Sequence, residues 1–183
     1  GFCESDQGTE ACLWNQFGEI VGLGDLPGGG FLSYAYGISD DDSVIVGYSY
    51  SESGQEAFRW TEETGMVGLG DLPGGGFSSY AEAVSADGLV IVGWSGTGGE
   101  GSWYGREAFI WDETNGMRNL KEFLVNDYGL DLTGWTLWEA SAISSDARVI
   151  AGSGKNPDGD QEAWIVRLPL VIYVDDDANS IGD

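Results

Sequence analysis

Short runs of alternating or β-branched apolar residues, separated by glycine-rich and acidic turns, recur along this chain. Between residues 35 and 70 the pattern predicts four strands, at 35–39, 44–48, 56–60 and 66–70. The same four are predicted again at 81–85, 89–94, 107–111 and 117–120. Three more follow at 140–144, 149–153 and 162–166. The chain is therefore expected to be built from short β-strands in groups of four.

The repetition is also visible in the sequence itself. The decapeptide GLGDLPGGGF occurs at residues 22–31 and again, unchanged, at 68–77. A Glu-Ala pair followed by Cys, Phe or Trp recurs at Glu10, Glu56, Glu107 and Glu162. Repeats of this length with four short strands are typical of β-propeller blades. We therefore expect an all-β, β-propeller-like domain at 1–169, with repeats near 1–30, 31–76, 77–134 and 135–169, or about three and a half blades.

Side-chain alternation predicts how these sheets pack. Phe58 and Trp60 lie on one face of their strand and Ala57 lies on the other. Large residues on one face and a small residue on the other suit a sheet packed between two neighbouring sheets. The alternation therefore places the repeat tryptophans Trp14, Trp60 and Trp111 in the core.

The third repeat departs from the pattern. Residues 120–135 replace the glycine-rich decapeptide, and Leu120, Phe123 and Leu124 have helical spacing between Asn119 and Gly129. We expect one short helix there.

The last repeat lacks an obvious fourth strand. After Pro169 a final strand candidate opens the C-terminal segment 170–183, which ends in an acidic tail. Its residues are Leu170, Val171, Ile172, Tyr173 and Val174.

Charge narrows the classes of partner. The chain has 31 Asp and Glu against 7 Lys and Arg, a net charge of −24, and no His. Nucleic acids and anionic membranes are bound through Lys and Arg, so neither is expected as a partner. No apolar window is long enough to insert into a membrane. Abundant glycine and scarce lysine favour a secreted, loop-rich β protein, and without an initiator Met or signal peptide, Gly1 is expected to be a processed or truncated end.

The two cysteines fall on neighbouring predicted strands. Aligning the first repeat with the second puts Cys3 where Ser49 is and Cys12 where Phe58 is. In a secreted chain this placement favours a disulfide between them. The alternative is two free buried thiols.

Taken together, these motifs resemble the HAF family of probable extracellular repeats. The resemblance rests on GLGDLPGGG, the Ser-x-Asp-Gly turn, VIVG and EAFRW, and it covers roughly residues 1–169. Glu replaces the His that gives the family its name, at Glu10, Glu56, Glu107 and Glu162. The resemblance implies a bacterial protein that is secreted or displayed at the cell surface, with a blade-like fold and no known activity.

Acidic loops are candidates for calcium. Oxygen ligands crowd three segments, and bound Ca²⁺ would relieve the self-repulsion of the chain. The candidates are Asp40, Asp41 and Asp42; Asp158 and Asp160 beside Asn156; and Asp175, Asp176 and Asp177. None of these segments matches an EF-hand, and solvated acidic turns are the alternative.

Aromatic residues offer a second kind of site. Trp94, Trp103 and Tyr104 lie in or beside the insertion at 96–106 and are candidates for a polysaccharide-binding rim.

The sequence does not favour an enzyme. The repeated Glu residues could suggest glycoside hydrolysis, but that reaction uses a unique carboxylate pair, whereas a residue placed identically in every repeat is structural.

We therefore expect a non-catalytic structural protein that self-assembles, head to tail into a filament, through the incomplete blades at its two ends. The alternatives are an extracellular carbohydrate- or calcium-binding module and, further off, an enzyme fragment.

Overall fold

The computed structural model describes residues 1–15, 17–74, 76–96 and 105–169 of the 183-residue chain. Within these residues the protein is all-β, with several antiparallel sheets and one short helix. The part of the chain described contains no helix long and apolar enough to cross a membrane.

The first sheet contains seven strands in two groups joined by one contact. Its strands are β1 (Phe2–Ser5), β2 (Gly8–Trp14), β3 (Ile20–Gly22), β4 (Gly28–Ile38), β5 (Ile45–Ser51), β6 (Gly54–Thr61) and β7 (Gly65–Gly68). Neighbours pair antiparallel except β2 and β4, which meet only where Thr9 lies parallel to Leu32. The sheet is therefore best treated as two units, β1–β3 (unit 1) and β4–β7 (unit 2).

Two further sheets complete the chain. Unit 3 contains β8 (Ser79–Val84), β9 (Val90–Gly96), β10 (Arg106–Asp112) and β11 (Gly116–Asn119). Unit 4 contains β12 (Thr136–Ile143), β13 (Val149–Lys155) and β14 (Gln161–Arg167). A parallel contact between Gln55 and Ser78 links units 2 and 3, at the repeat equivalent of the contact between Thr9 and Leu32.

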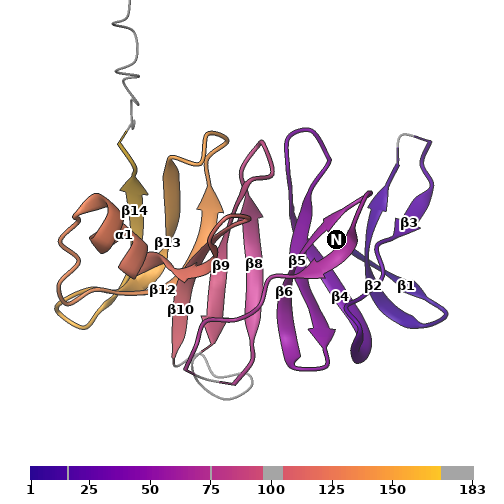
Figure 1. Cartoon of the computed structure of the whole chain (residues 1–183), viewed down its shortest axis with the longest axis horizontal. Helices are drawn as coiled ribbons and strands as arrows, with labels where there is room; N and C mark the ends of the chain where they lie inside the picture. The colour runs from indigo at the N-terminus through magenta and orange to yellow at the C-terminus, as the bar shows by residue number, and fades with distance from the viewer. Residues whose placement is uncertain (16, 75, 97–104, 170–183) are drawn as a thin grey trace, which may run out of the picture.

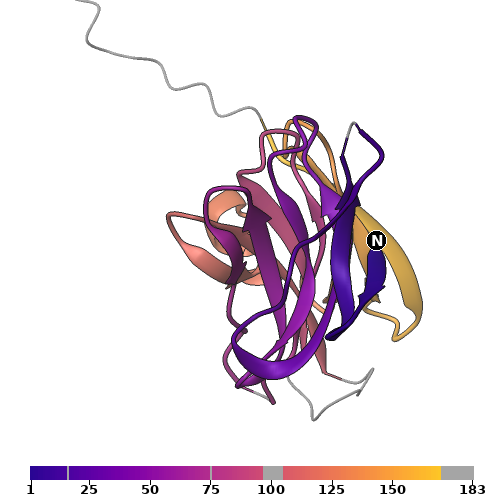
Figure 2. The same ribbon diagram turned by 90° about the vertical axis from the view of Figure 1, so that its right-hand side faces the viewer.

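The four units stand side by side in a row (Figure 1). Unit 1 is at one end of the row and unit 4 at the other, and the view along the row shows the sheets one behind another (Figure 2). The first strand of each later unit contacts several strands of the unit before it: β8 contacts β4, β5 and β6, and β12 contacts β8, β9 and β10. The strands expected from the sequence at 35–70, 81–120 and 140–166 are confirmed.

The core lies between the units. Three clusters each contain the aromatic residue of one unit and the alanine from the unit before it: Phe58 with Ala11, Phe109 with Ala57, and Trp164 with Ala108. The three alanines are 0–1% exposed because a large ring covers each of them. The strand alternation predicted this packing, since a small residue on one face makes room for a large residue on the next sheet.

Helix α1 (Leu120–Tyr128) forms where the sequence predicted it. The Asn119 side chain accepts a hydrogen bond from the Glu122 N–H at 3.1 Å, which caps the first turn. Gly129 ends the helix with φ 67°, a left-handed conformation that glycine adopts without steric cost. Leu120 and Leu124 are buried in the cluster between units 3 and 4, where the helix takes the place of the glycine-rich connection.

Three equivalent turns connect the first two strands of units 2, 3 and 4. In each turn a Ser hydroxyl donates to the Asp two residues later and accepts a backbone N–H five residues later. The pairs are Ser39 with Asp41, Ser85 with Asp87, and Ser144 with Asp146, at 2.6–2.7 Å. The residue after each Asp has positive φ: 61° at Asp42, 71° at Gly88 and 57° at Ala147.

The two copies of the decapeptide do not have the same secondary structure. Gly28 pairs with Ser51 and begins β4, whereas in the second copy the strand begins only at Ser79.

Candidate functional site

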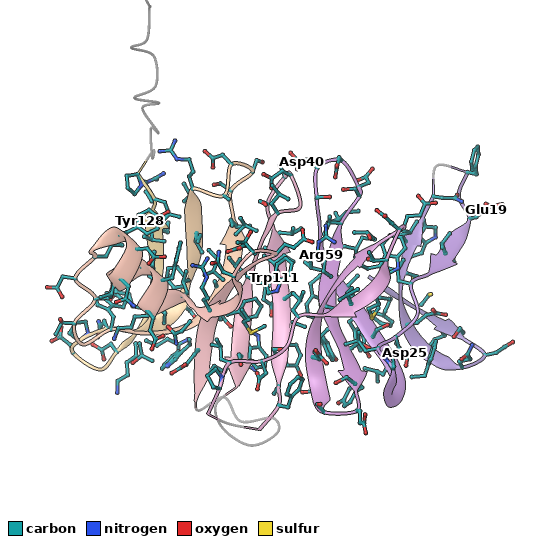
Figure 3. All side chains as sticks on the ribbon, in the orientation of Figure 1. Glu19, Asp25, Asp40, Arg59, Trp111 and Tyr128 are labelled. Atoms are coloured by element: carbon teal, nitrogen blue, oxygen red, sulfur yellow. The ribbon has the colours of Figure 1, made fainter. Side chains whose placement is uncertain are left out.

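The two ends of the row are the surfaces that distinguish this molecule, because each end lacks the neighbour that covers the equivalent surface inside. Glu19, on the turn of unit 1, and Tyr128, at the end of α1, mark opposite ends in Figure 3, with Arg59 and Trp111 between them.

At the unit 1 end, Trp14 and Ile20 are paired across β2 and β3 and are 61% and 57% exposed. The equivalent pair in unit 2, Trp60 and Met66, packs against the cluster between units 1 and 2. The prediction that Trp14 belongs to the core is therefore wrong. Its side chain has the orientation of Trp60, but none of the described sheets lies in front of it.

At the unit 4 end, the exposed face is the one that carries the alanine. Ala163 is exposed and Ile165 is 66% exposed, whereas the equivalent Ala108 and Ile110 of unit 3 are 1% and 4% exposed. Unit 4 covers Ala108, but no described residue covers Ala163. The two ends of the row therefore present the two halves of a contact that occurs three times inside it.

The repeated Glu residues support the connection between units. Glu10 accepts a hydrogen bond from the N–H of Gly24 at 3.1 Å, and Glu56 does the same for Gly70. Glu107 and Glu162 accept side-chain hydrogen bonds from Asn119 at 2.8 Å and Asn156 at 3.0 Å. Glu10, Glu56 and Glu107 thus bond to the segment that leaves their unit, whereas Glu162 bonds within unit 4.

An aromatic row crosses the units. Tyr34 and Tyr48 stack with centroids 5.3 Å apart in unit 2, and Tyr80 and Trp94 stack at 4.1 Å in unit 3. Tyr48 meets Tyr80 across the boundary at 4.4 Å, and Phe2 of unit 1 lies 4.9 Å from Tyr34. Burial raises the pKa of Tyr48, helped by the neighbouring phenols. The sequence contained a signal for this row, because Tyr34 and Tyr80, like Tyr48 and Trp94, occupy equivalent repeat positions.

The row ends at a group of charges. The Arg106 guanidinium lies 3.7 Å from the centroid of Trp94 and 3.7 Å from the Glu139 carboxylate of unit 4. The Trp94 indole N–H donates to Glu82 at 3.1 Å. Burial raises the pKa of Glu82 and lowers the pKa of Arg106. The ion pair between Arg106 and Glu139 links units 3 and 4, and the cation–π contact holds Arg106 against Trp94 within unit 3.

Trp94 is therefore not part of an exposed rim, and that prediction is wrong. Its ring is 8% exposed and lies between Tyr80 and Arg106. The other two rim candidates, Trp103 and Tyr104, lie outside the described residues, as does the strand candidate Leu170, Val171, Ile172, Tyr173 and Val174.

The candidate calcium loops use their oxygen atoms internally. The Asp41 carboxylate accepts hydrogen bonds from Ser39 and Ser43, which lower its pKa to about 2. The Asn156 amide oxygen accepts the backbone N–H groups of Asp158 and Asp160. In the described part of the chain no three His, Cys, Asp or Glu side chains gather to hold a metal. Asp40 and Asp42 belong to no group of three such side chains among the described residues. Asp175, Asp176 and Asp177 lie outside the described residues.

The predicted disulfide is not formed in this structure. Cys3 and Cys12 are free thiols. The register places Cys3 opposite Glu10 and makes Cys12 its diagonal neighbour. Burial raises the pKa of the Cys12 thiol to about 11, together with the hydrogen bond that this thiol donates to Cys3.

A hollow of about 810 Å³ opens at the turns of units 1 to 3. Its lining includes Arg59, the half-buried Trp60, and the carboxylates Asp42, Glu62 and Glu113. Arg59 makes no ion pair with any described residue. It also departs from the repeat, since Leu13, Ile110 and Ile165 are the equivalent residues.

Comparisons with known proteins assign no family to the chain. No family model and no curated protein sequence matches the chain. A solved structure described as “putative TolB from Agrobacterium tumefaciens” is similar to 91% of this chain and 73% of its own, with 11% sequence identity and a TM-score of 0.46.

Proposed function

We propose that this chain is a non-catalytic structural protein of the cell surface or extracellular space that assembles head to tail with copies of itself. The unit 4 face of one copy packs on the unit 1 face of the next and continues the row. In this proposal the four units are propeller-like blades, and the chain is a member of the HAF family of extracellular repeats.

The observation that carries the proposal is the repeated contact between units. Ala11, Ala57 and Ala108 are 0–1% exposed beneath the aromatic residue of the next unit, and Ala163 is the fourth member of the series, with no described residue over it. Trp14 and Ile20 supply the matching apolar surface at the other end. A contact that is head to tail, rather than twofold, adds copies without limit unless it closes into a ring.

Charge sets the conditions for this assembly. The net charge of −24 makes copies repel one another, and salt screens repulsion between exposed charges. The proposed contact between end faces buries apolar side chains, and salt does not weaken such an apolar contact. We therefore expect longer assemblies at 0.5 M NaCl than at low ionic strength.

Two end-face substitutions test the proposal. Trp14→Glu places a charge in one half of the contact, and Ala163→Arg places a large cation in the other half, so either should abolish assembly seen by sedimentation velocity and negative-stain electron microscopy. Leu89→Glu is the matched control, because Leu89 is 58% exposed but lies on a turn away from both end faces. Dispersed monomers of the unmodified chain at every salt concentration would refute the proposal.

The hollow beside Trp60 favours a second candidate, the binding of a glycan. An aromatic ring beside carboxylates and a guanidinium is suited to the apolar face and the hydroxyl groups of a sugar. Glycan-array screening with Trp60→Ala and Arg59→Ile would test it, since the second substitution introduces the residue present in unit 3. Binding that both substitutions leave unchanged would exclude this hollow as the site.

A further inference from the structure

A second open surface lies along the edge of the last sheet. β14 pairs with β13 on one side, and no described strand pairs with its other side. A hollow of about 390 Å³ adjoins this edge. Its lining comes from β14 (Trp164, Ile165, Val166 and Arg167) and from the segment after α1, including Leu132 and Trp135.

The four β14 residues are those that would hold a fourth strand. In unit 3 the equivalent stretch, from Phe109 to Asp112, pairs with β11. In unit 2 the stretch from Phe58 to Thr61 pairs with β7. The hollow therefore coincides with the place of the missing fourth strand, which we call the β14 slot.

One side chain of that strand fills the equivalent place in the other units. Met66 of β7 packs on the cluster containing Phe58, and Met117 of β11 packs on the cluster containing Phe109. The cluster containing Trp164 has no such partner among the described residues. Trp164 is 8% exposed, and its indole N–H is buried without a hydrogen-bond acceptor in the described structure.

The sequence contains a residue with the matching spacing. Met66 follows Phe58 by eight positions, Met117 follows Phe109 by eight, and Ile172 follows Trp164 by eight. Residues 171–174 are apolar and β-branched or aromatic, as a buried strand requires. Ile172 therefore has the chemistry and the register to enter the β14 slot.

The turn that would have to follow β14 disfavours pairing of residues 171–174 with β14 of their own chain. The turns between the third and fourth strands of units 2 and 3 end at Gly65 and Gly116, with φ 66° and 67°. The same turn in unit 4 would give positive φ to Val171, a β-branched residue that disfavours it. The Leu168 N–H also donates to the Arg148 carbonyl at 2.7 Å, so one hydrogen bond towards the β13 side follows the end of β14 at Arg167.

We propose that the β14 slot binds residues 171–174 of a second copy of this chain, with Ile172 in the position of Met66 and Met117. Two copies exchange these strands reciprocally about a twofold axis, so both slots are filled. This contact uses the edge of unit 4 rather than its face, and of the residues named here it shares only Ile165 with the head-to-tail contact proposed above.

The test uses mixing of two full-length variants in the Trp14→Glu background, which removes the head-to-tail contact. Ile172→Asp prevents residues 171–174 from binding and leaves the β14 slot intact. Val166→Lys prevents the β14 slot from binding and leaves residues 171–174 intact. Each variant alone should be a monomer, and the mixture should form a heterodimer by native mass spectrometry. Leu132→Asp replaces Val166→Lys if far-UV circular dichroism shows that the latter is unfolded.

Other outcomes overturn the exchange and are distinct from failure of the head-to-tail proposal. If Trp14→Glu is a monomer and Ile172→Asp lowers its melting temperature without changing its mass, the strand fills the slot of its own chain. If Ile172→Asp changes neither mass nor melting temperature, these residues do not occupy the slot. In either case assembly of the unmodified chain through its end faces would be unaffected.

Discussion

The Glu56 carboxylate accepts a hydrogen bond from the backbone N–H of Gly70 at 3.1 Å, across the connection that joins unit 2 to unit 3. A side chain at Gly68 would collide with the same carboxylate. Gly70 has φ 82°, which suits glycine. The glycines of the repeated decapeptide are thus partly explained by the Glu twelve to fourteen residues before them.

Loss of this carboxylate should destabilise the chain. Glu56→Ala leaves the Gly70 N–H without its acceptor, and we expect a loss of about 1–3 kcal/mol in the free energy of unfolding by urea denaturation. Glu56→Gln keeps an acceptor oxygen and is the matched control, with a smaller loss. Equal losses for the two variants would show that charge, rather than the hydrogen bond, matters at this position.

The turn of unit 4 can be improved. Ala147 has φ 57° at the position that Gly88 occupies in unit 3 with φ 71°. A non-glycine residue in this conformation costs about 1 kcal/mol, so Ala147→Gly should raise the free energy of unfolding by about that amount. In a domain of this size the melting temperature should rise by about 2–4 °C in calorimetry.

Gly88→Ala is the reciprocal change. The new methyl group would meet the side chain of Val44 as well as adopt positive φ, and we expect a loss of about 1–3 kcal/mol. A neutral result for both substitutions would mean that the turns relax freely.

Most of this fold can be predicted from the sequence, because the hydrophobic pattern of each strand occurs in more than one repeat. The strand periods, the caps of α1 at Asn119 and Gly129, and the alternation of Ala57 and Phe58 are local signals, and the structure contains all of them. To use these signals for the fold, one needs to assume only that each sheet packs on the next.

The exposure of Trp14 and the burial of Trp94 could not be predicted in this way. Both depend on which unit stands in front of a strand, and a repeat pattern assumes that every strand has the same neighbours. Trp14 has the orientation of a core residue and no cover, whereas Trp94 is covered by Arg106 and Tyr80. Position in the row, rather than local pattern, decides both outcomes.

Calcium chelation gives a further prediction. The Asp41 carboxylate and the Asn156 amide oxygen already accept internal hydrogen bonds, so the described acidic turns do not need a metal to fold. We expect 5 mM EDTA to leave the melting temperature and the assemblies seen by electron microscopy unchanged. Assemblies that disperse in EDTA and return with added Ca²⁺ would contradict this and assign a metal to the acidic loops.

The Glu82 carboxylate should make stability depend on pH. Burial raises its folded-state pKa above the ordinary value, so between the two values the folded chain holds more protons than the unfolded chain. The contribution of this group to stability is therefore favourable at low pH and is lost as pH rises through the raised folded value.

Glu82→Gln should remove that loss while its amide oxygen still accepts the Trp94 indole N–H. We expect the variant to melt at a higher temperature than the unmodified chain at pH 7, with the difference shrinking towards pH 4 as Glu82 becomes protonated. The matched control is Glu52→Gln, which makes the same change at an exposed position. If Glu82→Gln instead melts lower at pH 7, attraction between Glu82 and Arg106 outweighs the cost of burying the charge, and the group between units 3 and 4 is held together by its ion pairs.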